Sequence, residues 1–216
     1  MKRIRKNFII GVSLLTAFVL WTVAICFVDV HAIGPQGSSV GFASLNRFFH
    51  NLTGVNFELY TLTDWLGLVP ICVAFSFAIL GLVQWIKRRK IAKVDRNLLA
   101  LGGFYITVLA VYFLFETVVI NYRPVLIGGY LEVSYPSSTT LLVMCVMPTA
   151  MMQLGARIKN KIFRWCVLLI IALFIAFMVI GRLVSGVHWL TDIIGGALIS
   201  SALVMMYAYF CNINSR

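Results

Sequence analysis

The chain has 216 residues, of which 61% are hydrophobic and only 12% are charged, and its mean hydropathy is +0.96. A soluble domain of this size cannot bury so much apolar surface, whereas a lipid bilayer accepts it on the outside of a helical bundle. The formal net charge of +11 lies in short blocks of Lys and Arg between apolar runs, which is typical of loops near anionic lipid. The composition therefore predicts one membrane domain, residues 1–216, with no nucleic-acid partner.

Six apolar segments predict an all-α membrane protein, a six-transmembrane-helix bundle. Each is near the ~20 residues that a helix needs to cross ~30 Å of hydrocarbon. They span residues 8–28, 65–86, 98–120, 138–154, 165–180 and 189–211. The first follows a basic stretch like that of a signal peptide, but it is long enough to span a bilayer and no clean small-residue cleavage site follows. We interpret it as a retained helix.

The basic residues fall almost entirely on one side of this six-helix arrangement. They cluster before the first segment, between the second and third, and between the fourth and fifth, and Arg216 ends on the same side. Of the 18 Lys and Arg residues, only Arg47, Arg123 and Arg182 lie elsewhere. The positive-inside rule therefore predicts a multi-pass protein of the cell membrane with both termini in the cytoplasm.

The longest external loop is predicted at residues 29–64. It has a Gly/Ser-rich turn that leads into an apolar, aromatic stretch. This stretch predicts either a helix that lies at the membrane interface or a cap over a cavity, and the sequence leaves both open. The five cysteines form no CxxC pair, and no cluster of metal-ligating residues is present, so neither a metal nor a cofactor is expected.

Three polar segments lie at the external ends of the predicted helices, at residues 121–124, 135–140 and 181–192. In the last segment His188 and Asp192 are four residues apart, which places them one turn apart on a helix. The carboxylate would then accept the Nδ1 hydrogen of the imidazole and leave Nε2 free as a nucleophile or base. Arg182, expected in the preceding loop, offers a planar guanidinium to phosphate oxygens. The alternative is a structural His–Asp pair, with Arg182 reaching toward the headgroups.

The other two segments each allow a structural and a functional interpretation. Pro124 ends a helix and holds Arg123 at its rim, where an arginine serves as an interface anchor or as a phosphate ligand. Ser137, Ser138 and Thr139 follow a proline and predict a helix N-cap. The free N–H groups and hydroxyls of such a helix start also bind phosphate.

Together the three segments resemble the type 2 phosphatidic acid phosphatase family, relatives of the vanadium haloperoxidases. The family's third motif is Ser-Arg, five residues, His, three residues, Asp. Arg182, His188 and Asp192 match its spacing, with Gly181 at the serine position. The order of the motifs within residues 116–192 and the six-helix layout also agree with the family.

The other two motifs are matched in part. Residues 123–124 match the Arg-Pro of the first motif, whose lysine position, seven residues before the arginine, holds Glu116. Residues 136–137 match the start of the second motif, Pro-Ser-Gly-His, whose Gly and His positions hold Ser138 and Thr139. Thus one cation and one histidine of the family pattern are replaced.

The resemblance implies a phosphatase or phosphotransferase that acts on a lipid phosphate or diphosphate at the external face, with the phosphorylated lipid and the bilayer as its partners. His188 would attack phosphorus, Asp192 would orient it, and Arg123 and Arg182 would hold the phosphoryl oxygens beside residues 137–139. The family's second-motif histidine protonates the leaving oxygen. Its loss typically costs about 10²–10⁴ in rate, unless His50 folds over the site and supplies the proton.

Two other functions remain open from the sequence. A protein with the same fold and an impaired general acid would bind a phosphorylated lipid without efficient turnover, and Thr139 and Glu116 favour this alternative. A small transporter would need buried charges near the middle of the bilayer, for which Glu116 is the only candidate. The sequence indicates no oligomeric state.

Overall fold

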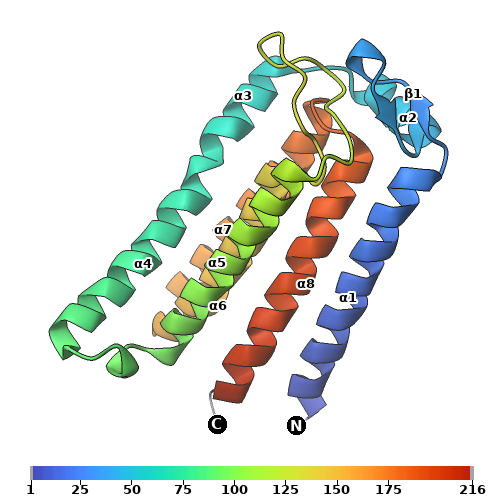
Figure 1. Cartoon of the computed structure of the whole chain (residues 1–216). Helices are drawn as coiled ribbons and strands as arrows, with labels where there is room; N and C mark the ends of the chain where they lie inside the picture. The colour runs from blue at the N-terminus through green and yellow to red at the C-terminus, as the bar shows by residue number, and fades with distance from the viewer. Residues whose placement is uncertain (1, 215–216) are drawn as a thin grey trace.

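The computed structural model describes residues 2–214 and is built almost entirely of helices (Figure 1). In chain order these are α1 (Lys2–Phe27), α2 (Ala43–Thr53), α3 (Phe57–Leu66), α4 (Leu68–Arg88), α5 (Arg96–Thr117), α6 (Ser138–Arg157), α7 (Lys161–Val184) and α8 (Leu190–Asn214). In this part of the chain, six helical segments are long and apolar enough to cross a membrane. The six-helix membrane bundle expected from the sequence is confirmed. Arg216 lies outside the described residues.

The second span begins earlier than the hydropathy pattern predicted. α3 and α4 join at Gly67 into one apolar span, Phe57–Arg88, so the preceding loop ends at residue 56 and not at 64. The polar residues of α3, Asp64 among them, lower its hydropathy and hid its start. The helix begins where it does because the Asn56 side chain accepts a hydrogen bond from the Leu59 N–H at 2.8 Å.

α6 and α8 form the centre of the bundle. α8 packs against α1, α5 and α6, and α6 also packs against α4 and α7. About half of the most apolar window of each is buried, 56% in α6 and 50% in α8, compared with 11–22% in the other four spans. The other four spans instead expose many large apolar side chains on the outside of the bundle, as a surface in contact with lipid requires.

The loops that matter for function gather at one end of the bundle, which we call the distal end because α1 begins and α8 finishes at the opposite end (Figure 1). A hairpin of β1 (His31–Ala32) and β2 (Ser39–Val40), the helix α2, the loop 118–137 and the turn 185–189 lie there. The other end carries the short 3-10 helix η2 (Ile91–Lys93) and the α6–α7 connection. A second 3-10 helix, η1 (Pro35–Gly37), connects the two strands.

Helix α2 is fixed on the start of α8. The Asn46 amide donates to the Gly41 carbonyl at 2.8 Å and to the Thr191 hydroxyl at 3.0 Å, and its carbonyl accepts from the Thr191 N–H. The opposite face of α2 is apolar and open, with Phe48 61% and Leu52 70% exposed. α2 therefore covers the end of α8 on one side and presents an apolar face on the other.

Helices α3 and α7 approach each other closely at Gly181. A Cβ at this position would lie 2.8 Å from the Thr63 methyl carbon, closer than real Cβ contacts occur. The Thr63 hydroxyl is tied to its own helix, because it donates to the carbonyls of Leu59 and Tyr60 at 2.9 and 3.0 Å. Glycine at 181 thus permits the approach that brings α3 over the end of α7.

We expect both termini and the α4–α5 connection to be cytoplasmic and the distal end to face outward, because the basic residues favour the cytoplasmic side. Reporter fusions after Arg216 and in the loop near Asn46 should give opposite signals. Matching signals would refute this topology.

We expect Gly181→Ala to lower the free energy of unfolding by about 1–3 kcal/mol through overpacking against Thr63. Adding Thr63→Ser removes the methyl group, retains the hydroxyl and should recover most of the loss. Thermal unfolding in detergent measures both variants. Gly155→Ala is the control, since an added Cβ there has no neighbour within 4 Å. A Gly181→Ala protein as stable as wild type would contradict the close contact.

Candidate functional site

The residues expected to carry chemistry come together at the distal end. Arg182 lies in the last turn of α7, His188 in the turn before α8, Asp192 in the first turn of α8, and Arg123 in the loop after α5. All four are at least nine-tenths buried. Two expectations were wrong in detail: Arg182 is helical and not in a loop, and His188 precedes α8 and does not lie on it.

Gly186 shapes the turn that carries His188. Its φ of 67° is in the left-handed region that favours glycine, and a Cβ there would lie 1.8 Å from the Gly54 carbonyl oxygen. The neighbouring Ser185 carbonyl accepts from the Asn56 N–H at 3.0 Å. The start of α3 is thereby held directly against the His188 turn.

Arg182 is only 1% exposed, and its charge is compensated by groups from α3 and α6. Its Nη2 donates to Thr139 Oγ1 at 2.6 Å and to Asp64 Oδ1 at 3.3 Å. Its Nη1 donates to the Tyr60 carbonyl and to Thr63 Oγ1, both at 3.4 Å. A buried guanidinium needs such partners because it has lost its water.

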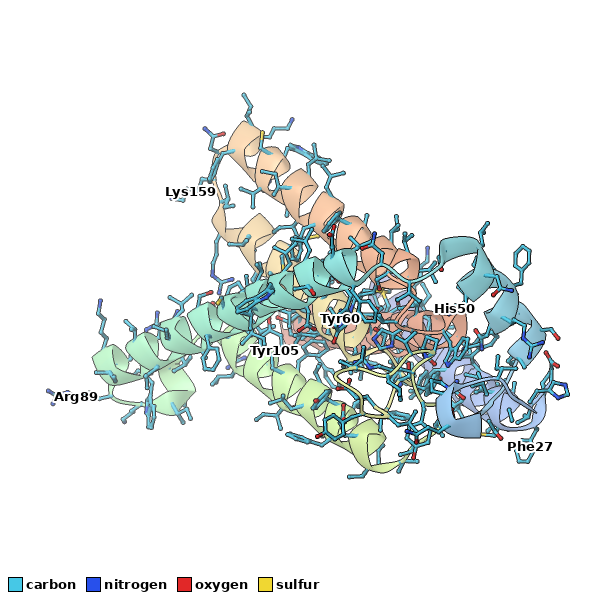
Figure 2. All side chains as sticks on the ribbon, turned by 90° about the horizontal axis from the view of Figure 1, so that it is seen from above. Phe27, His50, Tyr60, Arg89, Tyr105 and Lys159 are labelled. Atoms are coloured by element: carbon cyan, nitrogen blue, oxygen red, sulfur yellow. The ribbon has the colours of Figure 1, made fainter. Side chains whose placement is uncertain are left out.

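Arg123 also lies against the Tyr60 ring. The ring centre is 4.9 Å from the guanidinium carbon of Arg182 and 5.8 Å from that of Arg123, both within cation–π range. Arg123 Nε is 3.1 Å from a carboxylate oxygen of Glu132, without hydrogen-bond geometry. Seen from the distal end, Tyr60 lies near the middle of the molecule (Figure 2). Both cations therefore lie beside the same aromatic ring.

His188 and Asp192 are joined through a third residue. Their nearest atoms, Nδ1 and Oδ2, are 3.9 Å apart, too far for the direct hydrogen bond that the spacing predicted. The Ser134 hydroxyl lies between them, 3.0 Å from His188 Nδ1 and 2.5 Å from Asp192 Oδ2. Asp192 also accepts from the Asn121 amide at 3.3 Å and from the Trp189 N–H at 2.9 Å.

Burial lowers the pKa of His188 to about 4, and the positive charges of Arg123 and Arg182 act in the same direction, against the opposing effect of Asp192. The imidazole is therefore neutral at neutral pH, and one ring nitrogen has a lone pair. Since an imidazole must be neutral to act as a nucleophile, the environment keeps His188 in the reactive form.

The hydroxyl segment at the start of α6 divides its roles. Ser137 is the N-cap of α6, and its hydroxyl accepts from the Thr140 N–H and hydroxyl, so the structural interpretation holds for this side chain. Thr139 accepts from Arg182. Ser138 is half-buried and lines two cavities.

These two cavities differ in character. One, of about 490 Å³, is polar and is lined by Glu116, Arg123, Glu132, Ser134 and Ser138, among others. The other, of about 450 Å³, lies between α4, α5 and α6, and is mostly apolar except near Asp64 and the hydroxyls of Ser138 and Thr139. Ser138 lines both, so the polar and apolar spaces meet at the start of α6.

Four buried nitrogens of the candidate site residues have no hydrogen-bond partner among the residues that the structure describes: Arg123 Nε and Nη1, Arg182 Nε and His188 Nε2. Buried polar groups are nearly always paired, and those that are not call for an explanation. Two cations and a neutral imidazole with free nitrogens form a suitable site for a phosphoryl group.

His50 lies apart from this site. Its ring packs on that of Trp189, with 5.6 Å between the ring centres, on the α2 side of the molecule (Figure 2). It does not line either of the two cavities that meet at Ser138. Its role as a proton donor therefore stays a prediction that needs movement of α2.

Sequence reasoning missed the residues that hold the site together. Tyr60 and Thr63 come from a helix that was assigned to a loop, and Ser134 and Asn121 belong to the irregular segment between α5 and α6. A weak signal existed, since Asn121 adjoins the Arg-Pro pair and Ser134 stands two residues before Pro136. Nothing in the sequence indicated that these side chains meet.

The chain was compared with known proteins. Residues 123–216 match the sequence model of the PAP2 superfamily. Every site residue predicted from the sequence lies within this range. A PAP2-type phosphatidylglycerolphosphate phosphatase from Bacillus subtilis has a similar solved structure, with a TM-score of 0.59 and 19% identity over 94% of this chain and 96% of its own; at this identity the likeness is one of fold. No curated protein sequence matches. The second half of the chain thus matches the PAP2 superfamily, and the chain as a whole shares the fold of a transmembrane PAP2-type phosphatase.

Proposed function

We propose that this protein is a phosphatase or phosphotransferase that acts at the external face of the membrane on a lipid phosphate or diphosphate, with His188 as the nucleophile. The observation that carries the proposal is the set of four buried, unpartnered nitrogens on Arg123, Arg182 and His188. Each arginine has one carboxylate nearby, Asp64 or Glu132, and still leaves buried nitrogens unpartnered, so a phosphoryl group is the ligand that this arrangement fits best.

The proposed reaction has two steps. The Nε2 lone pair of His188 attacks phosphorus, an N–P bond forms, and the P–O bond to the leaving group breaks. Water, or an acceptor hydroxyl in a phosphotransferase, then attacks phosphorus and releases His188. Arg123 and Arg182 stabilise the negative charge on the equatorial oxygens in both steps, because they lie fixed in a low-dielectric site.

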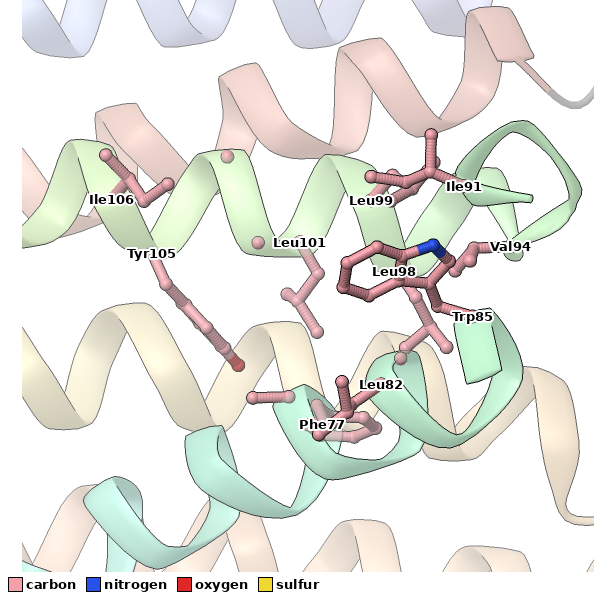
Figure 3. A pocket seen from close by; sticks show the side chains of 14 residues that line it. Phe77, Leu82, Trp85, Ile91, Val94, Leu98, Leu99, Leu101, Tyr105 and Ile106 are labelled. Carbon is pink, nitrogen blue, oxygen red and sulfur yellow. The ribbon is translucent and has the colours of Figure 1, made fainter. Parts of the chain in front are cut away.

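A lipid substrate is supported by an apolar groove between α4 and α5. The 450 Å³ cavity at Ser138 adjoins a second of about 290 Å³, with which it shares Ile71, Val108, Leu109 and Leu142. That one adjoins a third of about 410 Å³ through Ala78 and Tyr105. Figure 3 shows this last cavity, enclosed by Phe77, Trp85 and the apolar side chains of α5. An acyl or isoprenyl chain along this groove would present its phosphate at Ser138.

The second candidate function is binding of a phosphorylated lipid without efficient turnover. Thr139 favours it, because its hydroxyl is engaged by Arg182 and is not an acid. Glu116 also favours it, since its carboxylate lines the polar cavity beside Arg123 and would repel a phosphate there. The transporter alternative has lost its support, because Glu116 lies near the exposed end of α5 and not at mid-membrane.

The proposal is tested with purified protein in detergent and a panel of lipid phosphates and diphosphates, followed by phosphate release. Activity that His188→Ala abolishes supports the enzyme. His31→Ala is the matched control, since His31 is exposed in the hairpin and pairs with Asp29. Binding without turnover that survives His188→Ala would favour the binding protein instead.

We expect His188 to stay neutral far below the ordinary titration range. His31→Gln with His50→Gln leaves it as the single histidine, since the chain has three. Its NMR signal should titrate near pH 4, because burial disfavours the charged ring. Titration near 6.5, the value of an exposed histidine, would show that the ring is hydrated and would contradict this environment.

We expect the rate to depend steeply on the leaving group, because Thr139 cannot protonate it. Aryl phosphates should react fastest, diphosphates next and alkyl monophosphates slowest, in the order of falling leaving-group acidity. Thr139→His should raise the alkyl rate selectively, by up to the ~10²–10⁴ that a general acid supplies. Thr139→Gln controls for size. Equal rates for aryl and alkyl esters at limiting chemistry would show that another group donates the proton.

A further inference from the structure

The bridge between His188 and Asp192 has a defined direction. Ser134 Oγ lies 2.5 Å from Asp192 Oδ2 and 3.0 Å from His188 Nδ1, and all three side chains are buried. An ionised carboxylate only accepts hydrogen bonds, so the single hydroxyl hydrogen of Ser134 is donated to Asp192. The hydrogen between Ser134 and His188 must then belong to Nδ1.

This assignment decides which ring nitrogen is reactive. A neutral imidazole has one N–H, so a hydrogen on Nδ1 leaves the lone pair on Nε2. Nε2 is the nitrogen of His188 that has no protein partner. The hydroxyl of Ser134 therefore selects the tautomer in which the free nitrogen is the nucleophile.

We propose that Ser134 is a positioning residue for the reaction: it holds His188 in the Nδ1–H tautomer and transmits the negative charge of Asp192 to the ring. This inference rests on the proposed function, since it concerns the same nucleophile. Asp192 acts through Ser134 and not by direct contact, because 3.9 Å separate its nearest carboxylate oxygen from His188 Nδ1.

The surrounding contacts keep the bridge in place. The side-chain amide of Asn121 donates to Asp192, and the backbone carbonyl of Asn121 accepts from the backbone N–H of Ser134 at 3.0 Å. The Trp189 N–H fixes Asp192 Oδ2 from the other side. Asp192 is thus restrained from moving up to His188 and replacing the hydroxyl.

No proton needs to leave His188 in the proposed chemistry. When Nε2 forms its bond to phosphorus and the P–O bond breaks, the ring becomes a cation that retains its Nδ1 hydrogen. The Ser134 oxygen accepts that hydrogen and the Asp192 carboxylate stabilises the charge. When the oxygen of water bonds to phosphorus, the N–P bond breaks and its electron pair returns to Nε2, which restores the neutral Nδ1–H tautomer. The proton that water loses passes through solvent to the anion that departed in the first step.

The kinetic test compares Ser134→Ala, Ser134→Thr and Ser200→Ala with an aryl phosphate as substrate. Ser134→Ala should lower kcat about 10- to 100-fold with KM within about twofold, as is typical for loss of an orienting partner. Ser134→Thr retains the hydroxyl and should restore most of kcat. Ser200, a buried serine that donates to the carbonyls of Gly196 and Leu141, is the matched control and should change neither constant. A kcat of Ser134→Ala within threefold of wild type would overturn the proposal.

A second measurement does not depend on the folding of any Ser134 variant. In the ¹⁵N-labelled protein that retains only His188, the ring nitrogens should report hydrogen on Nδ1 and a lone pair on Nε2 at neutral pH. Hydrogen on Nε2 would overturn the bridge. If the protein hydrolyses no phosphate ester or diphosphate, the proposed function fails, whereas this spectrum still decides the role of Ser134.

Discussion

Arg182 is a guanidinium cation buried inside a membrane-spanning helical bundle, so protein groups must take the place of water around its charge. Five such groups surround it. α3 passes over the end of α7 and supplies a carbonyl, a hydroxyl and the carboxylate of Asp64, α6 supplies the hydroxyl of Thr139, and the Tyr60 ring covers one face of the guanidinium. Gly181 lets α3 come close enough to do so. The packing of α3, α6 and α7 at the distal end thus places polar groups around the charge of Arg182 and stabilises it.

The charge of Asp192, which is fully buried at the start of α8, is likewise stabilised by hydrogen bonds from the protein. Its two oxygens accept from Asn121, Ser134 and Trp189, and its carbonyl accepts the N–H of Ser137. The loop after α5, the start of α6 and the turn before α8 are therefore all hydrogen-bonded to one residue, Asp192. Ser134 in turn connects its carboxylate to the ring of His188.

The chemistry of the site follows from where polar and apolar spaces meet. The groove between α4 and α5 is lined mostly by apolar side chains, whereas the cavity at Glu116 and Arg123 is polar. Ser138 lines both, so in the proposed function the charged group of an amphiphile would lie toward Arg123 while its chain stays in an apolar environment. The carboxylates of Glu116 and Glu132 line the same polar cavity and would repel a phosphate there.

The sequence by itself determined the membrane class, the six spans and the set of polar residues at the helix ends, because hydropathy and charge blocks act over whole segments and need no knowledge of contacts. The spacing of Arg182, His188 and Asp192 also indicated a resemblance to the PAP2 superfamily, whose model matches residues 123–216. It did not determine that α3 is helical, because a few polar side chains lower local hydropathy even when tertiary partners satisfy them. Only the tertiary structure decided that Tyr60 covers both arginines and that Ser134 stands between His188 and Asp192. Those contacts join residues more than fifty positions apart, and a separation along the chain says nothing about a hydrogen bond of 3 Å in space.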